Sequence, residues 1–280
     1  MTERDEKSLF DKTVSRRNLL KGVGVGGAAA IFANALGVTA AGAAPAGDDP
    51  LTILSLGATA EGLAITAFYS IITKSSFYGS LPSVYQNYLK SALAQEQAHY
   101  DLWTANGGKP LTNQFFFPDG ILDNLALYVY TTDVLEGTFV GAYLAAIRRF
   151  AELGRPDLSW TVASVMGIEA EHKALNRAMG ISQANSAGAS DGIQNSPTRE
   201  PFEAATLYQV SQVAPTVGPT LMGGVAPASA GPLLAGVNFA TGPVTQPDRA
   251  TALSVANPLT NTPVPFQAFS FSNKHQLKTK

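Results

Sequence analysis

The sequence contains no cysteine, little charge and no excess of basic residues, and each absence excludes a class of protein. Without cysteine among its 280 residues, the chain has no disulfides, thiolate zinc sites, iron–sulfur clusters or thiol nucleophiles. Only 14% of the residues are charged and the formal net charge is −2, so the chain lacks the basic surface that nucleic-acid binding needs. Any chemistry must therefore use carboxylates, three histidines, hydroxyls or a cofactor.

The first 46 residues have the features of an export signal. A pair of arginines in residues 15–21 precedes a Gly- and Ala-rich apolar run over 22–41, and residues 41–43 and 44–46 both offer small-residue cleavage sites. We predict a twin-arginine signal peptide at 1–46, and a mature protein that is periplasmic, cell-surface or extracellular. An uncleaved membrane anchor is the alternative, because about 20 apolar residues can span a bilayer.

Removal of this segment leaves a mildly acidic chain. The 19 basic and 21 acidic residues fall to 13 and 17, because the segment holds six of the former and four of the latter. We expect the mature chain to be soluble, without stable membrane insertion and without a nucleic-acid partner.

The rest of the chain changes composition near Gly180. Apolar residues recur every three or four positions before it, whereas 11 of the 17 prolines lie after position 196. The spacing and the turn signals predict four helices over about 48–76, 80–107, 121–153 and 155–180. We therefore expect an all-α four-helix bundle at 48–181, a linker with a short helix at 182–213, and an extended, irregular Pro/Gly-rich tail at 214–280.

The predicted link between the second and third helices is longer than the other two. It covers residues 107–118, and 12 extended residues reach roughly 40 Å, which matches a 25-residue helix of about 37 Å. This link favours a bundle with one long crossover, and a plain up-and-down bundle with a loose loop is the alternative.

A glutamate occurs near the middle of every predicted helix, and two of these helices also carry a histidine. Two helices each carry a Glu-x-x-His motif, and residues three apart project to the same side of a helix. The other two helices each carry a glutamate within an apolar stretch, where an unpaired carboxylate would be costly. The candidate metal ligands are Glu61, Glu96, His99, Glu136, Glu169 and His172.

This set of side chains suits two divalent metal ions. Four carboxylates balance the charge of two such ions, and carboxylate and imidazole ligands accept both iron and manganese. A degenerate or mononuclear site is the alternative. Two further residues are candidates for the surroundings of the site. Asp133 could accept a hydrogen bond from the outer nitrogen of His99 or His172, or be a solvated aspartate, and Tyr143 could be a hydrogen-bond or radical partner, or only core packing.

With these residues in place, the sequence resembles the ferritin-like superfamily. More narrowly, it is similar to exported bacterial ferritin-like domain proteins related to plant desiccation-related proteins. The resemblance rests on the six ligand positions and on residues 195–210, which are similar to the segment that this family places after its fourth helix as a short fifth helix. It covers roughly residues 50–215.

The resemblance implies one of two functions. The first is an oxidoreductase of the catalase, peroxidase or ferroxidase type, whose dinuclear centre meets a small oxidant, peroxide or dioxygen. The second is a stress or desiccation-related or surface protein whose metals are mainly structural. We also expect a homo-oligomer formed through the bundle or the C-terminal tail.

Overall fold

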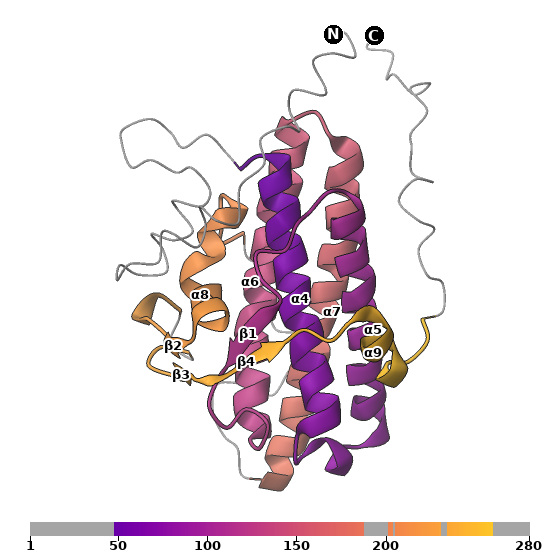
Figure 1. The fold of residues 1–280 in the computed structure, drawn as a ribbon, viewed down its shortest axis with the longest axis vertical. Coiled ribbons are helices and arrows are strands. Elements are labelled where there is room, and N and C mark those ends of the chain that lie inside the picture. The colour runs from indigo at the N-terminus through magenta and orange to yellow at the C-terminus, as the bar shows by residue number, and fades with distance from the viewer. Residues whose placement is uncertain (1–47, 188–200, 204, 231–233, 260–280) are drawn as a thin grey trace.

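Four long helices form the body of the protein in the computed structural model (Figure 1). The structure describes residues 48–187, 201–203, 205–230 and 234–259, so the predicted signal peptide and the end of the tail lie outside the described residues. The four helices are α4 (Pro50–Lys74), α5 (Ser83–Ala105), α6 (Leu125–Glu152) and α7 (Pro156–Ala187). The expected all-α bundle is thereby confirmed.

The helix bounds lie within four residues of the predicted ones, except at the end of α7. Asp49 caps α4 by accepting a hydrogen bond from the Thr52 backbone N–H at 2.9 Å, and Pro50 occupies the first turn. The predicted stop at Gly180 is wrong, because α7 continues to Ala187. One glycine inside a helix costs only about 1 kcal/mol, and the buried Met179 beside it keeps this stretch packed on the bundle.

The long connection between α5 and α6 runs along α4. At one end, the Lys109 and Leu111 backbone N–H groups donate to the side-chain oxygens of Ser55 and Thr59, near the start of α4. At the other end, the Ser76 N–H, just after α4, donates to the Leu122 carbonyl at 2.9 Å. Helices α4 and α5 form one hairpin and α6 and α7 the other, so the crossover that the link length favoured joins them (Figure 1).

The C-terminal part has more regular structure than the expected irregular tail. Strand β4 (Thr241–Thr245) pairs antiparallel with β1 (Gln114–Phe117) of the crossover, and α9 (Arg249–Val255) packs against α5. Residues 188–200 and 204 of the segment predicted to hold a short helix lie outside the described residues, residues 205–209 are not helical, and η2 (Val210–Val213) leads into α8 (Ala214–Met222). The remaining elements are η1 (Tyr78–Ser80), β2 (Gly224–Val225), η3 (Ala228–Ala230) and β3 (Asn238–Phe239).

Helix α4 is the most apolar of the long helices and lies inside the bundle. Among the described residues it is the one helix long and apolar enough to cross a membrane, yet 72% of its most apolar 18-residue window is buried in the protein. Burial of its Ile, Leu and Phe side chains against α5 and α6 accounts for that composition.

Candidate metal centre

The six predicted ligand residues meet in the interior of the bundle. Each of the four long helices contributes at its middle, which places all the groups at one depth regardless of helix direction. None is more than 8% exposed, and His99 is the most accessible of them. The structure therefore brings together Glu61, Glu96, His99, Glu136, Glu169 and His172.

The six residues form two overlapping groups of possible metal ligands. Glu61 and His99 belong to one group, Glu136 and His172 belong to the other, and Glu96 and Glu169 belong to both. Within each group, one ligand atom from every residue lies within 4.8 Å of the others. Glu96 and Glu169 could therefore contact an ion held by either group, whereas Glu61 and Glu136 could each contact an ion held by one group.

Several buried atoms of the cluster have no hydrogen-bond partner, which is the observation that fits a metal. They are Glu96 Oε1, Glu136 Oε2, Glu169 Oε1 and His172 Nδ1. His172 Nδ1 lies 2.9 Å from Glu96 Oε1, but the two atoms are not aligned for a hydrogen bond. Because buried polar atoms are nearly always paired, four unpaired lone-pair donors around one point indicate a site for cations.

The side of the His172 ring that faces away from the cluster is fixed by Gln95. Its Nε2 lies 2.9 Å from Gln95 Oε1, so Nε2 carries the proton and donates to the amide oxygen. That arrangement leaves the Nδ1 lone pair of the neutral ring for a metal ion. Partners of this kind hold a ligating imidazole in one tautomer and orientation.

Burial and mutual repulsion raise the pKa of two of the carboxyl groups in the metal-free protein. Burial, followed by the charges of Glu169 and Glu96, raises the pKa of Glu61 well above its ordinary value. The same two causes, in the same order, raise the pKa of Glu136. Two divalent cations would offset this repulsion, because their total charge is equal and opposite to that of four carboxylates.

The same carboxylates raise the pKa of the two histidines, because they favour the positively charged ring. Burial alone would lower the pKa of His172, but the neighbouring charge of Glu96 outweighs it and raises that pKa to about 9. For His99, the carboxyl groups of Glu169, Glu61 and Glu96 lie 3.2, 3.6 and 3.3 Å from Nδ1, and their influence outweighs burial and raises the pKa well above its usual range. A metal ion would therefore have to displace protons from this site when it binds.

Two aromatic side chains hold Glu61 from the side away from the shared carboxylates. Trp103 Nε1–H donates to Glu61 Oε1 at 2.9 Å, and the Tyr143 hydroxyl donates to the same oxygen. The two rings stack with centroids 5.7 Å apart. A Cβ at Gly57 would lie 3.3 Å from the Trp103 ring, so glycine gives the indole room to lie close to α4.

The structure places the other sequence candidates differently. Tyr143 lies at the site as a hydrogen-bond partner of Glu61. Asp133 instead forms an ion pair with Arg177 of α7, and Gln95 occupies the place on His172 that was expected for Asp133. Asp133 does share a helix face with Glu136, but the guanidinium group, itself buried, claims its carboxylate.

Sequence reasoning missed Trp103 and Gln95, and only the first left a usable signal. Trp103 follows Glu96 by seven residues, the same two-turn spacing that singled out Tyr143 after Glu136. Gln95 precedes a ligand by one residue, so nothing in the helical spacing directs its side chain toward a histidine of another helix.

Comparison with known proteins supports the fold. Residues 49–180 match the sequence model of the ferritin-like domain family, a range that covers the four long helices except the last residues of α7. No curated protein and no solved structure matches the chain.

Proposed function

The chain carries a ferritin-like domain, and from that premise we propose that it is an exported dinuclear metal protein that acts as an oxidoreductase on peroxide or dioxygen. The observation that supports this proposal is the pair of overlapping ligand groups with two carboxylates in common. Two ions that share carboxylates lie about 3.5 to 4 Å apart, close enough to act on one small molecule together.

The proposed metals are two divalent ions of iron or manganese. Redox-active ions of this kind, when bound, exchange electrons with peroxide or dioxygen, which none of the protein's own side chains does as readily. Glu96 and Glu169 would hold both ions, Glu61 and His99 would complete one site, and Glu136 and His172 would complete the other.

The surrounding residues support the site in two ways. Gln95 accepts from His172 Nε2, so Nδ1 is the nitrogen that faces a metal once the ring has lost a proton, and Trp103 and Tyr143 restrain the Glu61 carboxylate through one oxygen. The other Glu61 oxygen lies 3.6 Å from His99 Nδ1, on the side of the cluster. Partners of this kind would hold these ligands in one orientation when a metal binds.

A structural role for the metals is the second candidate function. It is favoured by the concentration of four carboxylates in a dry interior, whose repulsion metal ions would relieve. In that case the protein would serve in stress or desiccation protection, or at the cell surface. Export by the twin-arginine route and assembly into a homo-oligomer are part of both proposals.

Replacement of one terminal ligand separates the two functions. In the Glu136→Ala variant, a catalytic centre should lose peroxide or oxygen turnover while the melting temperature falls only modestly, because the apolar core of four helices remains. A structural centre should instead show no turnover in the parent, and the variant should melt near the temperature of metal-stripped protein. Unchanged metal content together with an unchanged melting temperature would remove Glu136 from the site.

A further inference from the structure

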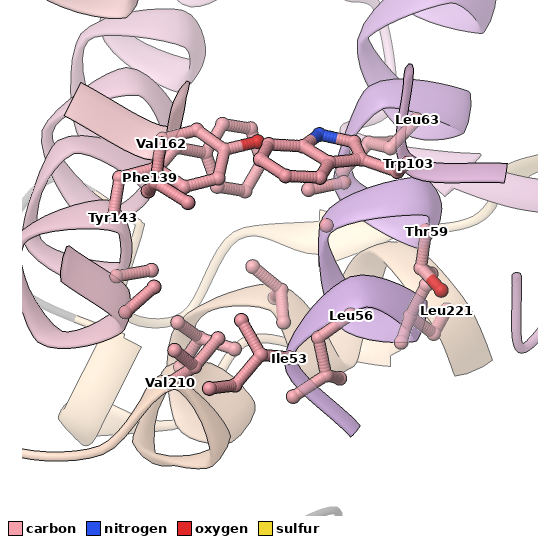
Figure 2. Close-up of a pocket in the computed structure, with 16 residues that line it drawn as sticks. Ile53, Leu56, Thr59, Leu63, Trp103, Phe139, Tyr143, Val162, Val210 and Leu221 are labelled. Carbon is pink, nitrogen blue, oxygen red and sulfur yellow. The ribbon is translucent and has the colours of Figure 1, made fainter. Parts of the chain in front are cut away.

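An apolar cavity lies next to the candidate metal centre, on the far side of the two aromatic rings that hold Glu61. It has a volume of about 40 Å³ and lies between α4, α6 and the η2–α8 segment. Figure 2 shows Trp103 and Tyr143 along one side of this cavity, with Ile53, Leu56 and Val210 on the opposite side. The two aromatic rings therefore separate the cavity from Glu61.

The residues that line the cavity are almost all apolar. Three lining side chains have polar groups, and each is already used: Trp103 and Tyr143 donate to Glu61, and the Thr59 hydroxyl donates to the Ser55 carbonyl at 2.7 Å. A buried water needs two to four polar partners, which these walls do not supply. The cavity is therefore suited to an apolar guest rather than to water or peroxide.

The size of the cavity limits the guest to a short group. One water-sized sphere needs roughly 10 to 15 Å³ on this scale, so about 40 Å³ holds about three such groups in contact. We propose that this cavity binds a short alkyl group, about three carbon atoms long, of an organic molecule placed beside the metal centre. The proposal rests on the proposed function, which it deepens by naming a class of molecule that the site accepts.

A second cavity of the same volume provides the matched control. It lies between α4, α6 and the β1–β4 region and is lined by Ala67, Ser70 and Tyr128, among others. The hydroxyl groups of Ser70 and Tyr128 are buried there without a hydrogen-bond partner, so its walls are less suited to an alkyl group. A side chain enlarged at Ala67 would fill this cavity and leave the first unchanged.

Trp103 supplies a direct reporter, because the chain has only two tryptophans. In a Trp160→Phe background, Trp103 is the single indole and forms part of the cavity wall. We expect 1-bromopropane, whose heavy atom quenches indole emission on contact, to remove most of the emission of the metal-loaded protein in a saturable manner. Bromide ion should have little effect, and propane, which has three carbon atoms and no heavy atom, should restore the emission by competition.

Two variants in which leucine replaces alanine then identify the cavity in which the probe binds. Ala142→Leu fills the first cavity and should abolish the quenching, whereas Ala67→Leu should leave it unchanged. The same assay with 12-bromododecanoate distinguishes a free small molecule from the end of a long chain, and quenching by either probe supports the site. Absence of saturable quenching, or quenching that survives Ala142→Leu, would overturn the proposal.

Metal content measured on the same samples keeps the two proposals distinguishable. Quenching in a protein that holds no metal would contradict the proposed function and leave the cavity intact. Two bound ions without quenching would contradict the alkyl site alone.

Discussion

Replacement of Trp103 by phenylalanine should lower the affinity for one metal ion and leave the affinity for the other unchanged. The change removes the Nε1–H that donates to Glu61 Oε1 at 2.9 Å, but it keeps an aromatic ring between Gly57 and Tyr143. A hydrogen bond to a charged group contributes about 1.5–3 kcal/mol, and loss of an outer partner of a metal ligand typically costs about 10–100-fold in affinity. The two figures agree, since that range corresponds to about 1.4–2.8 kcal/mol.

Calorimetric titration of metal-free protein with Mn²⁺ measures this effect. Only the ion in the group that contains Glu61 and His99 should bind more weakly, because Glu61 is absent from the other group. The matched control is Trp160→Phe, which changes the other tryptophan, a residue that is 52% exposed and outside the cluster. An equal loss at both ions in Trp103→Phe, or no loss at either, would refute the reasoning.

Three further predictions follow from the same contacts. Metal analysis should find one ion per chain in Glu136→Ala but none in Glu169→Ala, because only Glu169 belongs to both ligand groups. The metal-free protein should lose stability between about pH 6.5 and pH 9, by roughly 3 kcal/mol from His172 alone. Folding raises the pKa of His172 to about 9, so the stabilisation from its protonated form is complete only below the pKa of the unfolded chain. Thermal melts should show this decline in metal-free protein and not in metal-loaded protein. Asp133→Ala should cost about 1.5–3 kcal/mol in urea unfolding with metal content unchanged, because it removes a hydrogen bond between two charged groups, and a loss of metal would instead restore Asp133 to the site.

The bundle and the ligand cluster could be predicted because their signals are local. Each long helix shows its own apolar spacing and its own mid-helix glutamate, so Glu61 and Glu136 could be assigned without knowing which helices are neighbours. The crossover was also accessible, because its length is a property of one segment of the chain.

The features that escaped prediction depend on contacts between distant segments. Strand β1 has four residues and pairs with β4 more than 120 residues later, with Gln114 opposite Thr245, and neither strand has an alternating pattern that would reveal it. Asp133 shows the same limit within the bundle. Its helix face could be predicted, but the ion pair with Arg177 depends on how α6 and α7 pack.

The proposed function depends most on two metal ions that the carboxylates of Glu96 and Glu169 would hold in common. The most direct measurement is an anomalous-scattering map, recorded at the iron and manganese absorption edges, from crystals of protein purified from its own host. If the proposed function is correct, the map should show two peaks about 3.5 to 4 Å apart among the six buried side chains, with Glu96 and Glu169 contacting both. A map with no peak there, or with a single peak, would contradict it.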